Sequence, residues 1–149
     1  MATYQGKKAE NPSSKRVRIT MAVLFFIQVI FTTFPFMRGD IGDGIESSVT
    51  AFGMVVHPGV AYTADSIKLA VFGGIFVIFP MVAFFFCLFD KYSNVKNFVS
   101  AACCVICVAL IVFGIGPGYI AIGSVITILL YVLILFFTAQ SFQASILRD

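Results

Sequence analysis

Residues 97–147 contain no charged side chain, and this uncharged stretch limits the possible folds more than any other feature of the sequence. A bilayer core about 30 Å thick is crossed by roughly 20 apolar residues in helical conformation. The stretch is therefore too long for one crossing. Gly116, Pro117 and Gly118 divide it, because they stop a helix and favour a tight turn. This pattern predicts two membrane-spanning helices, over residues 98–115 and 120–140.

Two further uncharged stretches lie earlier in the chain, over residues 19–37 and 69–89, and each is bounded by charged residues. Each has the length of one crossing. Only 11% of all residues are charged and 60% are hydrophobic, whereas about a quarter are charged in an average soluble domain. These features predict an all-α integral membrane protein, a single four-transmembrane-helix bundle within residues 19–147.

The basic residues lie unevenly on the two sides of the predicted bundle. Of the ten Lys and Arg residues, only Arg38 and Lys68 fall on the side of the loop 38–68. Because Lys and Arg are enriched in cytoplasmic segments, both termini are predicted to be cytoplasmic and this loop to be extracytoplasmic. The basic tail 1–18 is an orientation signal with affinity for anionic lipid headgroups, and no nucleic-acid partner is expected.

The extracytoplasmic loop contains a helical pattern of apolar residues. Ile45, Val49, Phe52 and Val56 recur at the spacing that places side chains on one face of a helix. We therefore expect a short amphipathic helix in this loop, resting on the membrane surface or on the bundle.

Three cysteines gather in the third predicted span. Cys104 and Cys107 have the spacing of a thiol redox pair, and Cys103 lies beside them. A reactive thiol must be accessible and must ionise, which an apolar setting disfavours, so a packing role is favoured. No His or acidic residue lies nearby to complete a zinc site. We expect no catalytic group, metal or cofactor, and Cys87, near the cytoplasmic end of its span, is a candidate for palmitoylation.

Small residues on three predicted spans are candidate helix-packing positions. They are Ala70, Gly74, Ser100, Cys104, Ala121 and Ser124. Small side chains let membrane helices approach closely, and several of these residues are spaced four apart on one helix face. The pattern fits contacts inside the bundle and contacts with a partner's helix equally well.

Polar groups inside the predicted spans are few. Gln28 needs a hydrogen-bonding partner in the bilayer, whereas Thr32 and Thr33 can bond to carbonyls of their own helix. None of the four predicted spans contains Asp, Glu, Lys, Arg or His. Proton relays and voltage sensors depend on such ionisable groups, so these mechanisms are disfavoured.

These observations predict a non-enzymatic tetraspan that acts as an accessory or scaffold subunit of a larger membrane protein complex. Its partners would be other integral membrane proteins and lipids, contacted through helix packing. The alternative is a lipid-handling or small transport module in which Gln28, Thr32 and Thr33 line a path. A thiol oxidoreductase using Cys104 and Cys107 ranks last.

The plan of four helices with both termini inside resembles that of MARVEL-type tetraspans in topology and length. This resemblance implies a role in organising membranes. The predicted span lengths fit secretory-pathway and other endomembranes better than a thicker plasma membrane, and both locations stay open.

Overall fold

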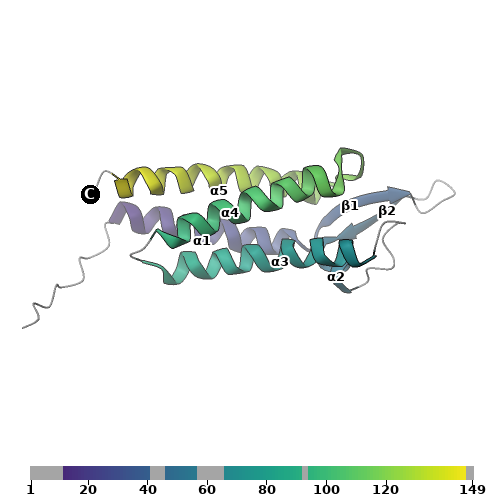
Figure 1. Cartoon of the computed structure of the whole chain (residues 1–149), viewed down its shortest axis with the longest axis horizontal. Coiled ribbons are helices and arrows are strands. Elements are labelled where there is room, and N and C mark those ends of the chain that lie inside the picture. Colours follow the sequence, from purple (N-terminus) through teal and green to yellow (C-terminus); the bar gives the residue numbers. More distant parts are fainter. Residues whose placement is uncertain (1–11, 41–45, 57–65, 92–93, 147–149) are drawn as a thin grey trace, which may run out of the picture.

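The computed structural model describes residues 12–40, 46–56, 66–91 and 94–146, which form a long helical bundle with a β-hairpin at one end (Figure 1). The long helices are α1 (Pro12–Phe31), α3 (Ser66–Phe89), α4 (Val95–Ala109) and α5 (Ile122–Ile146). The hairpin strands are β1 (Pro35–Asp40) and β2 (Glu46–Thr50), and the short helix α2 (Ala51–Val56) follows directly. A π-helical segment, η2 (Leu110–Ile115), extends α4, and a 3-10 turn, η3 (Pro117–Tyr119), leads towards α5.

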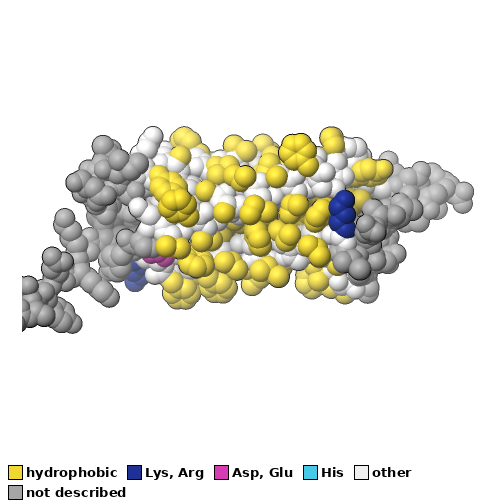
Figure 2. All heavy atoms as spheres, in the orientation of Figure 1, with side chains coloured by type: hydrophobic (Ala, Val, Ile, Leu, Met, Phe, Trp, Pro, Cys, Tyr) yellow, Lys and Arg dark blue, Asp and Glu magenta, His cyan; other side chains and the backbone are white. Residues whose placement is uncertain are grey.

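Three described helical segments are long and apolar enough to cross a membrane: Ala70–Phe89, Val95–Ile115 and Ile122–Gln143. They overlap the predicted spans 69–89, 98–115 and 120–140, and they support the prediction of a mostly helical membrane protein. Their outer surfaces are apolar, as Phe113 at 87% exposed and Leu129 at 64% exposed illustrate. Hydrophobic side chains cover the middle of the visible face, whereas the visible charged side chains lie towards its two ends (Figure 2).

The first predicted span, residues 19–37, is wrong in its last part, because α1 ends at Phe31 and β1 begins at Pro35. Pro35 has no backbone N–H and biases the residue before it away from helical conformation. The hydroxyls of Thr32 and Thr33 donate to the carbonyls of Val29 and Ile30 and so satisfy acceptors at the helix end.

The start of this helix also differs from the prediction, since α1 begins at Pro12 inside the predicted tail 1–18. Lys15, Arg16 and Arg18 therefore lie on the helix itself. These charges explain why α1 is not among the segments that qualify as membrane-spanning by length and composition.

The prediction of one amphipathic helix in the loop is also wrong, because strand β2 takes the place of its first part. Val49 lies on β2 and is 8% exposed, whereas Phe52 and Val56 lie on α2 and are 55% and 50% exposed. Ile45 lies outside the described residues. The helical spacing misleads here because β1 needs a hydrogen-bonding partner, which β2 provides in an antiparallel register that pairs Arg38 with Ser48.

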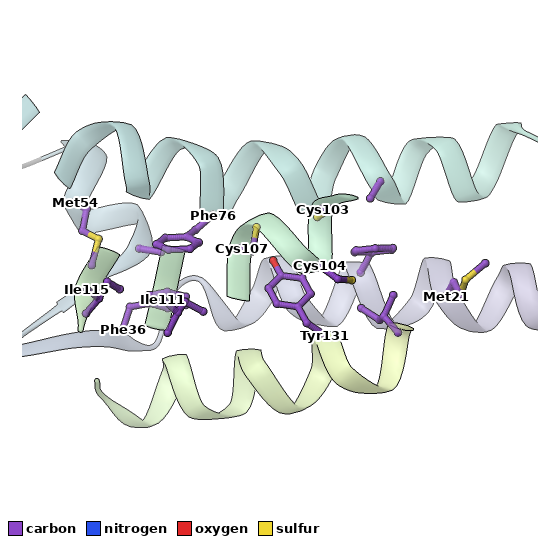
Figure 3. Packing of buried hydrophobic residues seen from close by; sticks show 14 of the residues in the cluster. Met21, Phe36, Met54, Phe76, Cys103, Cys104, Cys107, Ile111, Ile115 and Tyr131 are labelled. Carbon is purple, nitrogen blue, oxygen red and sulfur yellow. The ribbon is translucent and has the colours of Figure 1, made fainter. Parts of the chain in front are cut away.

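The core runs along the bundle between its helices, and the hairpin is joined to it. Phe36 from β1 and Phe76 from α3 are both fully buried, with ring centroids 4.7 Å apart (Figure 3). Helix α1 packs against α3 and α5, and α4 packs against the same two helices. The start of α1 and the end of α5 lie at the same end of the bundle, opposite the hairpin (Figure 1).

Candidate functional site

Most of the predicted small-residue positions face the interior of the chain's own bundle. Ser100, Cys104, Ala121 and Ser124 are each no more than 1% exposed. The Ser124 hydroxyl donates to the carbonyl of Phe36, so it joins α5 to the hairpin. Ser100 Oγ lies 3.5 Å from Cys87 Sγ, which joins α4 to α3. These four residues are therefore used for internal packing.

The remaining pair, Ala70 and Gly74, lies on a different part of the surface. A Cβ atom added at Gly74 would meet no atom within 4 Å, so the space beside this residue is open. Further along the same side of α3, Ile78 is 57% exposed, Met81 42% and Val82 41%. We call these five residues the outward α3 face, and it is apolar throughout.

Gly73, the neighbour of Gly74, lies about 100° further round the helix and faces α2. A Cβ atom at Gly73 would lie 2.6 Å from the carbonyl oxygen of Ala51 and 2.8 Å from the Cβ of Met54. Helix α2 therefore packs on α3 at a distance that only glycine allows. Sequence reasoning missed Gly73, although it is spaced at helical intervals from Phe76 and Ala83, which are both buried.

A second close approach joins the start of α5 to the hairpin. A Cβ atom at Gly123 would lie 2.5 Å from the carbonyl oxygen of Pro35. The N–H of Ala121 donates to the carbonyl of Phe36 over 3.3 Å. The first residues of β1 thus lie directly against the backbone of α5, and sequence reasoning did not identify Gly123.

Gln28, Thr32 and Thr33 do not line one path. Gln28 is fully buried, and its Nε2 donates to Thr127 Oγ1 over 2.9 Å, while its Oε1 has no hydrogen-bond partner among the described residues. Thr32 is buried, but Thr33 is exposed on the outside of the bundle. The amide of Gln28 therefore joins α1 to α5.

The cysteines lie deep in the core. Cys103 is 3% exposed, and Cys104 and Cys107 are fully buried free thiols. The hydroxyl of Tyr131 on α5 points towards Cys107 (Figure 3). Among the described residues, no group of three or more His, Cys, Asp or Glu side chains gathers in a way that fits a metal ion.

Cys87 is also fully buried, although the sequence suggested that it is a candidate for palmitoylation. Its Sγ packs against Ser100 on α4. Attachment of an acyl chain would require α3 and α4 to separate, so this fold does not present the thiol to an acyl donor.

The end of the bundle opposite the hairpin is held by charged side chains. Arg18 is only 5% exposed, and its Nη1 donates to the carbonyls of Cys87 and Leu88 over 2.8 and 2.7 Å. These carbonyls belong to the last turn of α3, where cations are favourable. The N–H of Lys96 donates to Asp90 Oδ2 over 3.0 Å at the start of α4. The sequence placed Arg18 in the tail and gave it no structural role.

No protein-family model matches the chain, and comparisons with curated proteins and with solved structures find no match. Within the described ranges, buried polar groups bond mainly to other parts of the chain, and the outside of the long helices is apolar. Such an arrangement is compatible with a membrane-embedded protein.

Proposed function

We propose that this chain is a four-crossing membrane protein with cytoplasmic termini, and that it serves as a non-enzymatic accessory or scaffold subunit of a membrane protein complex. The outward α3 face, with its open position at Gly74, is the observation that carries this proposal. The secretory pathway is the proposed location, with the plasma membrane as the alternative.

In addition to the three apolar helices, the first crossing of the chain is formed by α1 together with the first residues of β1. The uncharged part of α1, residues 19–31, has a helical length of about 20 Å, which is short of a bilayer core of about 30 Å. Residues 32–34 form hydrogen-bonded turns that rise about 2 Å each. Pro35 and Phe36 are extended and add about 3.3 Å each, so the five residues together supply roughly the missing length. Gln28 contacts Thr127, and Phe36 contacts Ser124, so this composite segment runs along α5 to its start.

The backbone of this composite crossing is protected by the rest of the protein. Non-helical backbone is tolerated at membrane depth only where protein covers it or water reaches it. The carbonyl of Phe36 accepts hydrogen bonds from the Ala121 N–H and the Ser124 hydroxyl. An even number of crossings leaves both termini on one side, and the excess of Lys and Arg there favours the cytoplasm.

The outward α3 face is the proposed contact with a partner's transmembrane helix. Membrane helices associate through van der Waals packing, which is closest where a small residue lets the backbones approach. Gly74 supplies such a position, and the exposed side chains of Ile78 and Val82 continue the contact along α3. The bulkier side chains of Phe98 and Phe113 are both exposed and are suited to contact lipid.

Anionic lipid headgroups are proposed as partners at the end opposite the hairpin. Lys15 and Arg16 at the start of α1 are exposed, and so is Lys91 after α3. Each basic residue near an anionic membrane surface contributes about 1 kcal/mol of attraction. The earlier part of the basic tail lies outside the described residues.

The neighbouring glycines allow a sharp test of the partner interface. The experiment compares Gly74→Ile with Gly73→Ile, using the tagged full chain extracted gently from its native membranes after cross-linking. Gly74→Ile is expected to keep the fold, because its side chain enters open space, and to lose the cross-linked partner. Gly73→Ile is expected to disturb the fold, because its side chain collides with α2.

Two results would contradict the proposal. One is purification of the native chain with no stoichiometric partner under any gentle condition. The other is a Gly74→Ile variant that retains the partner at the native ratio. Gly74→Ala serves as the graded control, since one methyl group should weaken the contact less than a whole isoleucine side chain.

A further inference from the structure

Helix α2 packs beside one end of a helical segment that is long and apolar enough to span a membrane. Its Ala51 carbonyl and Met54 pack against Gly73 of α3. Gly73 belongs to the first turn of Ala70–Phe89, one of the three segments apolar enough to span a membrane. A helix that touches the first turn of a span lies beside the end of the hydrocarbon core.

The first residues of helix α2 lie directly beyond the end of α1. The N–H of Phe52 donates to the carbonyl of Thr32 over 3.4 Å, just beyond the end of α1. Helix α1 packs on α3, and α2 packs on α3 towards the hairpin end (Figure 1). The chain therefore leaves the bundle as β1, returns as β2, and fills the outer end of the first crossing with α2.

The surface of α2 has an inner and an outer side, and both are apolar. Ala51 and Met54 are fully buried against the bundle. Phe52 is 55% exposed, Val55 41% and Val56 50%, and the six residues of α2 include no polar or charged side chain. If this helix faced water, three large apolar side chains would stay hydrated next to a membrane that can bury them.

Charged and aromatic side chains at the same end fit a membrane boundary. Arg38 on β1 and Lys68 before Ala70 are exposed, at positions from which they can reach lipid phosphates. Tyr119 in η3 is 52% exposed, and tyrosine is enriched where the acyl chains meet the headgroups.

We propose that α2 is a re-entrant segment that embeds in the outer leaflet and contacts lipid at the boundary between headgroups and acyl chains through Phe52, Val55 and Val56. This inference rests on the proposed membrane crossing but not on the proposed protein partner. The lipid contact fixes the depth of the hairpin end and compensates for the early end of α1.

The absence of tryptophan from the chain makes single-Trp reporters possible. Phe52→Trp is the test variant, Leu129→Trp reports the middle of a span, and Ser48→Trp reports the exposed side of the hairpin. Each purified full-length variant is reconstituted into phosphatidylcholine vesicles. Bromines near the headgroup end or near the methyl end of the acyl chains quench fluorescence from lipid, and acrylamide quenches it from water.

We expect Phe52→Trp to lose more fluorescence to the bromines near the headgroup end than to those near the methyl end. Its emission should also be blue-shifted relative to that of Ser48→Trp. Leu129→Trp should show the reverse preference for bromine position. Val56→Trp should behave like Phe52→Trp and provides the answer if the Phe52 variant does not fold.

The inference would be overturned if acrylamide quenched Phe52→Trp as strongly as it quenches Ser48→Trp and the lipid bromines did not quench it. Stronger quenching by the deep bromines than by the shallow ones would overturn it as well. If Leu129→Trp is quenched by lipid and Phe52→Trp is not, α2 alone is misplaced and the membrane bundle stands. If neither is quenched by lipid, the membrane crossing itself is wrong.

Discussion

The two ends of the bundle are held together by different physical means. At the hairpin end, backbone meets backbone: Gly73 lies against Ala51, and Gly123 lies against Pro35. At the opposite end, the Arg18 side chain reaches from α1 to the carbonyls that finish α3. Substitutions that add atoms should therefore destabilise the hairpin end, and substitutions that remove atoms should destabilise the opposite end.

This difference follows from the surroundings that each end must satisfy. In the proposed membrane arrangement, the hairpin end contains non-helical backbone at the membrane boundary, where unpaired N–H and C=O groups are costly, so the chain covers them by close contact. The opposite end carries most of the basic residues that the structure describes, and there a charged side chain can satisfy helix-end carbonyls while its neighbours remain hydrated.

The largest effect is expected for Gly123→Ala. The new Cβ would lie 2.5 Å from the carbonyl oxygen of Pro35, so α5 and β1 would have to separate. We expect the free energy of unfolding to fall by about 3 kcal/mol, even though alanine is favoured over glycine in a helix by about 1 kcal/mol. Circular dichroism during titration of dodecyl maltoside micelles with SDS measures this change.

Gly118→Ala is the matched control for this prediction. A Cβ atom at Gly118 would meet nothing within 4 Å, so its stability should change little. Equal stability of the Gly123 and Gly118 variants would show that the hairpin end is not held by close backbone contact.

A smaller loss is expected for Arg18→Ala at the other end. The variant removes donors to the carbonyls of Cys87 and Leu88. Because hydrogen bonds to charged groups contribute about 1.5–3 kcal/mol and water can partly replace them here, we expect a loss of about 2 kcal/mol in the same titration. Arg16→Ala, at an exposed site two residues earlier, is the control and should change stability little. Equal effects of the two variants would mean that Arg18 acts only through its charge.

The three long apolar helices could be predicted because the apolar character of a membrane span is summed over about 20 residues, so no single contact decides it. The uncharged stretch 97–147 and the Gly116-Pro117-Gly118 turn were enough to place two of them. The end of α1 depended instead on Pro35 and on the pairing of β1 with β2, which is a contact between separate segments. Neither strand carried an alternating pattern strong enough to reveal it.

The packing positions could be recognised by residue type but not by direction. Ser100 and Cys104 were correctly chosen as small, yet only the fold shows that they face the interior. Gly73 and Gly74 are the same residue type, and a rotation of about 100° between neighbouring helix positions decides which of them touches α2. Arg18 was missed because a basic residue before an apolar run usually reports orientation, whereas here it also caps another helix.

The smallest effect is expected in the middle of the bundle, for Gln28→Leu. The variant loses the hydrogen bond to Thr127, and such bonds inside membrane proteins contribute about 0.6 kcal/mol on average. It also removes the buried Oε1, which has no partner among the described residues, so the two contributions largely cancel. We expect stability to change by less than about 1 kcal/mol.

Thr127→Val should cost more, about 1–2 kcal/mol, because it leaves the whole Gln28 amide buried without its partner. If Gln28→Leu instead lowered stability more than Thr127→Val in the SDS titration, the middle of the bundle would depend on Gln28 for more than this one hydrogen bond.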